Sequence, residues 1–197
     1  MRLLAVSDDR DKLLETRLER GRIAKPDLII SCGDLHPSYL DYVATLANAP
    51  LYYVRGNHDT DERGYGSAGG TDLDCRVVDA GGLRIAGLSG SLDYREGIVG
   101  FSEGEMRMRA LRVAALAKLM GGIDVLVTHA PPRGYGDLDD RPHRGFECFN
   151  WLLRTLRPKL LLHGHVHLDY GIVPREQEHP CGTRIVNAFR FWEGELG

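Results

Sequence analysis

The sequence predicts an α/β fold in which residues 1–197 form a single domain. Short apolar runs of strand length alternate with segments of helical periodicity, which is typical of parallel βαβ units. Most of these runs end in glycine and polar residues, as expected where strands deliver side chains to one edge of a sheet. A length of 197 residues with 43% hydrophobic content allows one substantial core and does not require a second domain.

Strand and helix alternate through the first sixty residues. The expected strands of this part are residues 3–6, 28–31 and 51–54, and the expected helices are residues 12–20 and 38–47. The first of these helices carries leucines at helical spacing among charged residues, so it should cover one face of the sheet. A glycine-rich stretch without apolar periodicity follows at residues 61–74 and predicts a loop.

The second part of the chain opens with a hairpin and a long helix. Two apolar runs, 76–78 and 83–88, flank a Gly-Gly turn, and a capping box at 102–105 starts a helix that runs to residue 120. The later expected elements are a strand at 123–127, a helix at 146–156 and strands at 159–162, 171–173 and 184–191. The last two strands should add to the sheet in antiparallel orientation.

Composition excludes several classes of protein. A net charge of −3 and a pI near 6.2 argue against a general nucleic-acid binder, which carries a basic face. The apolar run after Met1 is too short for a signal peptide, and no run reaches the length of a membrane span. The four cysteines form no C-x-x-C pair, so no disulfide framework is expected. We therefore expect a cytoplasmic protein with reduced thiols and no membrane partner.

Polar residues with metal-ligand chemistry follow five of the expected strands. These candidate residues are Asp8, Asp34, Asn57, His58, His129, His165 and His167. Carboxylates, imidazoles and one amide oxygen form a mixed ligand set that suits manganese, iron or zinc better than calcium. His165 and His167 are two residues apart and share one side of an extended backbone, whereas His163 lies deeper and is expected to be a packed structural residue.

The order of these motifs resembles that of the calcineurin-like metallophosphoesterase family, in particular its small phosphodiesterase branch. The family pattern runs D-x-H, G-D, G-N-H-[DE], a single histidine and G-H-x-H. The chain carries Asp8-Asp9-Arg10, Gly33-Asp34, Gly56-Asn57-His58-Asp59, His129 and Gly164-His165-Val166-His167. Four of the five motifs are intact and cover nearly the whole chain. The resemblance implies a four-layer αββα sandwich with mixed sheets.

The resemblance also implies a role for each candidate residue. Asp34 would bridge two divalent ions, with Asn57, His129 and His165 completing the second metal position and Asp8 and His167 contributing to the first. Manganese is the preferred ion, with iron or zinc as alternatives. His58 would lie beside the leaving oxygen as a general acid or hydrogen-bond donor, while a metal-activated hydroxide attacks phosphorus.

Arg10 departs from the pattern because it replaces the histidine of D-x-H. A guanidinium remains protonated and has no lone pair for a metal, so the first position lacks one ligand. Three outcomes follow: two metals with water in the vacancy, one metal with Arg10 binding phosphate, or lost activity. His36 is a further candidate ligand or substrate contact, and the simplest alternative for Arg10 is a surface pair with Asp9 or Asp11.

The sequence therefore predicts a metal-dependent phosphoesterase that acts on a small phosphorylated substrate. A phosphodiester is the preferred substrate class. The alternatives are a mononuclear phosphatase that uses Arg10 and a metal-binding scaffold module with weakened catalysis. Arg133, Tyr135 and Arg141, in the polar segment after His129, are candidate contacts to the substrate.

Overall fold

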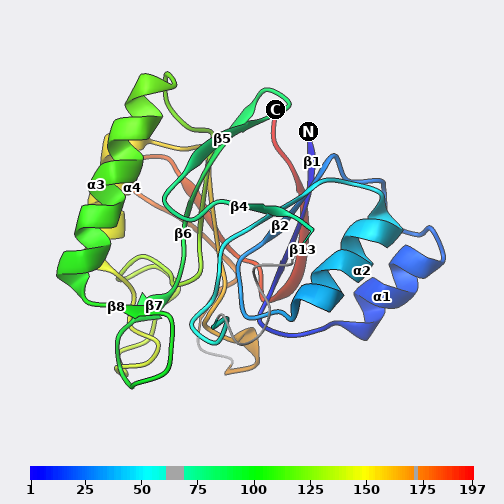
Figure 1. The fold of residues 1–197 in the computed structure, drawn as a ribbon, viewed down its shortest axis with the longest axis horizontal. Helices are drawn as coiled ribbons and strands as arrows, with labels where there is room; N and C mark the ends of the chain where they lie inside the picture. The colour runs from blue at the N-terminus through cyan, green and yellow to red at the C-terminus, as the bar shows by residue number, and fades with distance from the viewer. Residues whose placement is uncertain (61–68, 171–172) are drawn as a thin grey trace.

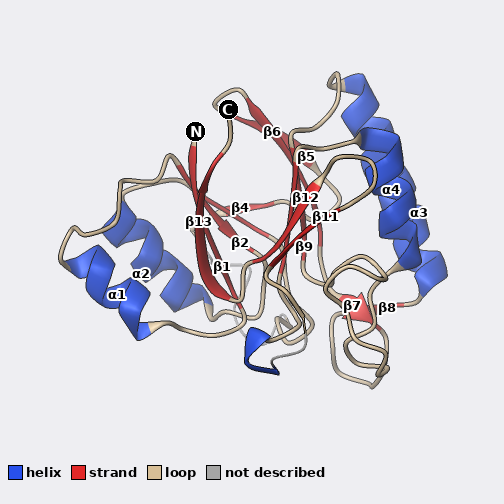
Figure 2. Ribbon diagram, turned by 180° about the vertical axis from the view of Figure 1, so that it is seen from behind, coloured by secondary structure: helices blue, strands red, loops and turns tan. Residues whose placement is uncertain are grey.

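Two facing β-sheets with a pair of helices on each outer side make up the fold. The computed structural model describes residues 1–60, 69–170 and 173–197 (Figure 1). Figures 1 and 2 show α1 and α2 on one side of the sheets and α3 and α4 on the other. This arrangement confirms the predicted αββα sandwich.

The first sheet contains five strands in the order β13-β1-β2-β3-β4. The bounds of these strands are β1 Arg2–Ser7, β2 Leu28–Ser31, β3 Leu51–Tyr53, β4 Thr71–Asp72 and β13 Arg190–Glu195. Strands β1 to β4 are parallel, and β13 pairs with β1 in antiparallel orientation. Helices α1 (Lys12–Glu19) and α2 (Pro37–Ala47) connect β1, β2 and β3 as two βαβ units.

The second sheet contains six strands in the order β11-β12-β10-β9-β6-β5. Their bounds are β5 Val77–Ala80, β6 Leu83–Leu88, β9 Val125–Thr128, β10 Leu160–His163, β11 Glu176–Glu178 and β12 Arg184–Asn187. The four central strands are parallel, while the edge strands β5 and β11 are antiparallel to their neighbours. Two short strands, β7 (Ser91–Leu92) and β8 (Gly100–Phe101), form a separate ribbon.

Three apolar clusters hold the four layers together. The central cluster lies between the sheets and includes Ile30, Ile85 and Val127, all fully buried. A second cluster packs α3 (Glu103–Leu119) and α4 (Glu147–Leu156) on the six-stranded sheet, and a third packs α1 and α2 on the five-stranded sheet. Each sheet is therefore covered on both faces, which accounts for its continuous apolar strands.

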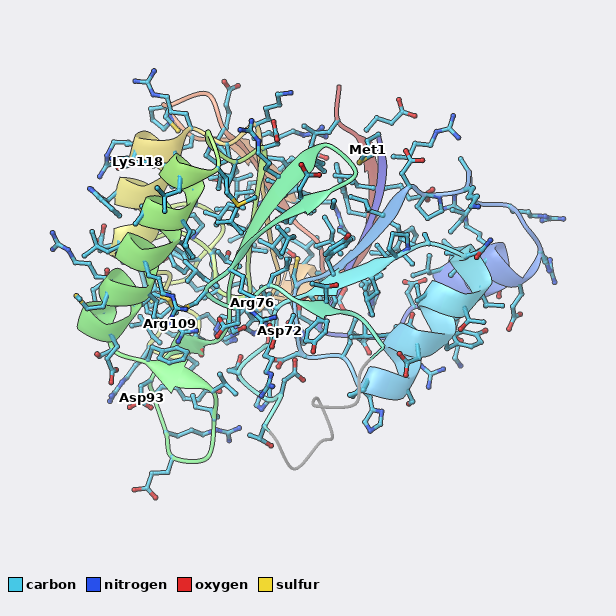
Figure 3. All side chains as sticks on the ribbon, turned by 45° about the horizontal axis from the view of Figure 1, so that its top comes forward. Met1, Asp72, Arg76, Asp93, Arg109 and Lys118 are labelled. Carbon is cyan, nitrogen blue, oxygen red and sulfur yellow. The ribbon has the colours of Figure 1, made fainter. Side chains whose placement is uncertain are left out.

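The predicted capping box at the start of α3 is confirmed. Ser102 Oγ accepts a hydrogen bond from the backbone N–H of Glu105, and the Glu105 carboxylate accepts one from the Ser102 backbone. Farther along α3, Arg109 donates to both carboxylate oxygens of Asp74, at 2.5 and 2.6 Å. Asp74 lies between β4 and β5, so this pair ties the helix to the segment that links the two sheets, in which Figure 3 labels Asp72 and Arg76.

The end of the chain differs from its prediction. One strand was expected at 184–191, but the structure contains two strands in different sheets, β12 and β13. Arg190, the first residue of β13, has a φ of 62°, a left-handed conformation that breaks an extended run. The strand expected at 171–173 falls largely outside the described residues. The loop expected at 61–74 ends in the short strand β4, whereas residues 61–68 are not described.

In the described residues, no helix combines the length and apolar character that a membrane span requires.

Candidate metal centre

The predicted metal ligands lie where parallel strands of both sheets end. Asp8 follows β1, Asp34 follows β2, and His129 follows β9 directly. A cavity of about 300 Å³ opens at this edge, beyond which the 3-10 helix Leu168–Tyr170 lies (Figure 2). Its lining residues are Asp8, Asp34, Asn57, His58, Tyr94, Pro142, His143, His165, His167 and Tyr170.

Tight backbone turns bring the motifs together. Asp8, Asp34 and His165 have φ angles of 66°, 59° and 68°, in the left-handed region that costs a non-glycine residue energy. Two glycines allow the close approach: a Cβ on Gly33 would overlap the backbone of Gly56, and a Cβ on Gly56 would overlap the Asp34 carboxylate. The G-D and G-N-H-D motifs therefore pack backbone to backbone.

Asp8, Asp34 and His129 form a group that could hold a metal ion. Each residue offers one ligand atom, and these atoms lie within 4.8 Å of one another. His129 is fully buried, and its Nε2 lies 3.4 Å from Asp34 Oδ2. Two carboxylates and an imidazole are donors suited to a divalent transition metal.

The hydrogen bonds of His129 provide a test of whether a cation fits this group. Nδ1 lies 2.8 Å from the carbonyl oxygen of Cys32, so Nδ1 carries a proton. Nε2 faces Asn57 Oδ1 at 2.9 Å, and the Asn57 amide nitrogen donates to the Tyr94 hydroxyl at 3.2 Å. With the proton on Nδ1, His129 Nε2 is an acceptor, and so is Asn57 Oδ1. Their contact requires either a second proton on the ring or a cation between the two atoms. The residues present therefore fit a bound metal ion.

Backbone donors orient the carboxylates. Asp34 Oδ1 accepts a hydrogen bond from the N–H of His58 at 2.8 Å, and both oxygens of Asp8 accept from the N–H of His165 at 2.9 and 3.1 Å. Such outer contacts fix ligand orientation and remain when a metal binds. Asp34 thereby presents Oδ2 to His129.

Burial and mutual charge shift the pKa values of these groups in the metal-free chain. Burial, with a contribution from Asp34, raises the pKa of Asp8 to about 6 against the charge of His129. Burial alone would raise the pKa of Asp34, but the charge and hydrogen bond of His129 lower it to about 2. Burial alone would lower the pKa of His129, but Asp34 and Asp8 raise it to about 9. A positive charge is thus strongly favoured between these carboxylates.

His165 and His167 reach the cavity from the segment after β10. His165 Nε2 donates to the carbonyl oxygen of Pro142 at 2.7 Å, and its ring meets the His129 ring edge to face at 4.8 Å. Burial, and then the charge of His129, lowers the pKa of His165 to about 3. The Nδ1 lone pair is therefore available for a ligand. His167 stacks on Phe189, with ring centroids 4.5 Å apart.

His58 lines the cavity but is not in the three-residue group. Its Nδ1 lies 3.4 Å from Nη2 of Arg95, which can only donate. His58 Nδ1 is therefore the acceptor, and Nε2 carries the ring proton. This tautomer suits a hydrogen-bond donor.

His163, predicted to be a packed structural residue, is 1% exposed and outside the cavity lining. Its Nδ1 bonds the carbonyl oxygen of Gly164 at 3.0 Å. Burial lowers the pKa of His163 to about 4.

The structure does not bring Arg10 to the cavity. Its guanidinium donates two hydrogen bonds to Glu15, at 2.9 and 3.1 Å, and lies over the Tyr39 ring at 4.9 Å. Glu15 is the partner of Arg10, rather than the expected Asp9 or Asp11. Glu15 lies in the first turn of α1, and its carboxylate faces the Arg10 guanidinium. The Arg10 side chain is 64% exposed.

His36 and the candidate substrate contacts of the later loop also lie outside the cavity lining. His36 caps α2 and accepts a hydrogen bond from the backbone N–H of Ser38, because Pro37 starts the helix there. Arg133 forms ion pairs with Asp137 and Asp139. The remaining two candidates, Tyr135 and Arg141, are absent from the residues that line this cavity.

Sequence reasoning missed four cavity residues: Tyr94, Pro142, His143 and Tyr170. They belong to none of the motifs: three lie in loops, and Tyr170 ends the 3-10 helix Leu168–Tyr170. His143 is held by Asp140, with Nδ1 2.7 Å from its carboxylate. An Asp-x-x-His spacing is a weak signal by itself, so only the fold places this pair at the cavity.

The chain was compared with families, curated proteins and solved structures. A model of the calcineurin-like phosphoesterase family matches residues 1–169. The lariat debranching enzyme of Schizosaccharomyces pombe is 27% identical over 207 residues, covering 87% of this chain and 44% of that protein. Human metallophosphoesterase domain-containing protein 1 is 34% identical over 55 residues, covering 26% of this chain and 17% of that protein.

The matched regions thus cover less than half the length of each of these two curated relatives. Among solved structures, a 5'-nucleotidase precursor from Thermus thermophilus aligns with a TM-score of 0.54 at 14% identity, covering 100% of this chain and 51% of that chain. At this identity the similarity shows a common fold.

Proposed function

Because the chain belongs to the calcineurin-like phosphoesterase family, we propose that it is a metal-dependent phosphodiesterase with its active site at the cavity after β1, β2 and β9. The observation that carries the proposal is the convergence of Asp8, Asp34 and His129, with Asn57 Oδ1 facing His129 Nε2 at 2.9 Å. These residue types are the ligands that divalent transition metals prefer.

The proposed metal centre is dinuclear. Asp34 would be shared by the two ions, and Asn57, His129 and His165 would hold one of them. Asp8 and His167 would hold the other, for which Arg10 supplies no ligand. When bound, divalent ions lower the pKa of water to supply a nucleophile and balance the charge of the phosphoryl oxygens. Manganese is the proposed ion, with iron or zinc as alternatives.

The protein residues hold the reacting groups in place. Nε2–H of His58, fixed by Arg95 at Nδ1, donates to the oxygen that leaves phosphorus. His143 lines the cavity next to Pro142, and its Nδ1 is held by Asp140. Its Nε2 has no hydrogen-bond partner among the described residues. This nitrogen is placed to contact a phosphoryl oxygen or a substituent of the substrate.

A phosphodiester is proposed because the cavity lining includes tyrosines from two distant segments of the chain. Tyr94 lies between β7 and β8, and Tyr170 ends the 3-10 helix that follows β10. The two aromatic residues provide surfaces for the two organic groups of a diester, whereas a monoester would leave one of them without contact. The proposed partner is accordingly a small phosphorylated molecule.

The mononuclear alternative requires Arg10 to bind phosphate. Arg10 instead pairs with Glu15 outside the cavity lining, so the described contacts give this alternative no support. The scaffold alternative predicts metal binding without turnover.

The test is hydrolysis of bis(p-nitrophenyl) phosphate and of p-nitrophenyl phosphate by metal-stripped protein that is titrated with manganese while bound ions are counted. Diester hydrolysis that rises with two ions per chain is the expected result. His129→Ala should abolish metal binding and activity, whereas His36→Ala, outside the cavity, should leave both unchanged. Metal binding without hydrolysis of either ester by this protein would contradict the proposal.

A further inference from the structure

A second cavity lies away from the metal centre, between α4 and the turn that joins β11 to β12. It has a volume of about 400 Å³. Its lining residues are Tyr135, Asn150, Arg154, Arg157, His179, Pro180 and Cys181. None of these residues lines the metal cavity.

A cysteine and a histidine are paired in this cavity. Cys181 Sγ lies 2.9 Å from His179 Nδ1, and the Cys181 backbone N–H donates to the same nitrogen at 3.2 Å. The turn that carries them is fixed by two backbone hydrogen bonds, from His179 to Thr183 and from Gly182 to His179. The thiol is therefore held beside an acceptor for its proton.

The surroundings favour the neutral form of the imidazole, in which one ring nitrogen has a free lone pair. Burial, and then the positive charge of Arg154, lowers the pKa of His179. The Tyr135 ring packs against the His179 ring with centroids 4.9 Å apart, which fixes its orientation.

Cys181 differs from the other three cysteines. Cys32 and Cys148 are buried, and burial raises the pKa of both thiols. Burial, and then Asp74, also raises the pKa of Cys75. Cys181 is half-buried, lines a cavity and has an imidazole within hydrogen-bond distance.

Two further features indicate what the cavity would bind. The side chains of Arg154 and Arg157 have no hydrogen-bond or ion-pair partner among the described residues, so they offer positive charge to an anion such as a carboxylate. Asn150 is 8% exposed; its amide nitrogen donates to the carbonyl oxygen of Arg133, but its Oδ1 has no hydrogen-bond partner in the described part of the chain. An acceptor without a protein partner at this position can take an N–H or O–H donor from a bound molecule.

We infer that this cavity is a reactive-thiol site at which Cys181 attacks a small anionic disulfide that also carries N–H donors. His179 Nδ1 takes the thiol proton, and the Cys181 sulfur bonds to one sulfur of the disulfide as its S–S bond breaks. The leaving sulfur keeps the electron pair of that bond and receives the proton from His179. Cys181 is thereby oxidised to a mixed disulfide, and the other half of the reagent is reduced to a thiol.

The probe for the test is oxidised glutathione, whose carboxylates and amide N–H groups match this description. The folded chain is incubated with it at pH 7.5, and peptide mass spectrometry gives the rate of modification at each cysteine. We expect Cys181 to react at least about tenfold faster than the same cysteine in the urea-unfolded chain. Equal rates in the folded and unfolded chains would overturn the inference without any variant.

Variants separate the roles of the base and the charges. His179→Asn keeps an acceptor for the Cys181 backbone N–H but removes the base, and should slow the reaction about tenfold. The double variant Arg154→Gln/Arg157→Gln should slow reaction with oxidised glutathione but not with the uncharged bis(2-hydroxyethyl) disulfide. Arg20→Gln/Arg22→Gln makes the same change of charge at exposed positions after α1 and should change neither rate.

An unchanged rate in His179→Asn, or equal slowing with both disulfides in the arginine variant, would contradict the inference.

Discussion

The buried Asp59 carboxylate accepts a hydrogen bond of 2.6 Å from the backbone N–H of Asp34. The same oxygen accepts a bond of 2.8 Å from the N–H of Gly56. The last residue of the G-N-H-D motif therefore holds the backbone of the G-D motif, where Asp34 takes a left-handed conformation. Asp59 shapes the metal centre without lining its cavity.

We predict that Asp59→Ala weakens metal binding about 10- to 100-fold, the range that is typical for loss of a residue supporting a ligand. The reason is that Asp34 loses the contact that holds its backbone in place. Asp9→Ala is the matched control, because Asp9 is exposed and pairs with Arg190 at 3.6 Å. Metal affinity is measured by competition with a chelator. Equal affinity in the two variants would show that Asp59 does not position Asp34.

Arg10 gives a second prediction, since its side chain points away from the centre. Arg10→Gln should leave turnover unchanged and change the free energy of unfolding very little, because an ion pair this exposed is screened by water. Arg10→His should instead raise the affinity of the weaker metal position, because an imidazole there supplies the ligand that D-x-H motifs carry. Ion counts under limiting manganese distinguish the two variants. A large loss of diester hydrolysis in Arg10→Gln would favour phosphate binding by Arg10.

The motif residues show which parts of the site can be predicted from the sequence. Asp8, Asp34 and His129 could be placed at one edge because parallel strands align their carboxyl ends, a rule that holds whatever the loops do. Arg10 and His36 could not be placed, because their positions depend on which helix begins nearby: Glu15 of α1 binds one, and the other caps α2.

Loop residues were beyond prediction for a related reason. His143 and Tyr94 are held by contacts to Asp140 and Asn57 that exist only after the chain has folded. Arg190 similarly divides the final apolar stretch between two sheets through a left-handed backbone, for which a single arginine gives no sequence signal.

His58 provides a third prediction. His58→Ala should lower turnover about 10²- to 10⁴-fold, the usual contribution of a general acid, while metal content remains at the wild-type level. The side chain lines the cavity but lies outside the group of Asp8, Asp34 and His129. Single-turnover rates with a diester that has a good leaving group should fall less than those with a poor one, since a good leaving group needs little protonation. Loss of metal in His58→Ala would assign the residue a ligand role instead.

The pH dependence of metal binding gives the fourth prediction. In the metal-free chain the carboxylates of Asp34 and Asp8 raise the pKa of His129 to about 9, so below that pH the ring carries two protons. A metal ion must displace one of them, because Nε2 faces the ligand group. Affinity should therefore rise about tenfold per pH unit between pH 7 and pH 9 and level off above it.

Metal affinity rises with pH because the pKa of His129 is raised. Protons therefore compete with the metal ion for the ring up to a higher pH than usual, and this competition ends as pH rises through the raised pKa. At pH 6 and below, protonation of Asp8, whose pKa is raised to about 6 mainly by burial, should steepen the dependence. Calorimetry of zinc or manganese binding in buffers of different ionisation enthalpy measures the protons released directly. Release of about one proton by the ion that binds His129 is expected at pH 7.5, and a value near zero would mean that His129 is neutral before this ion binds.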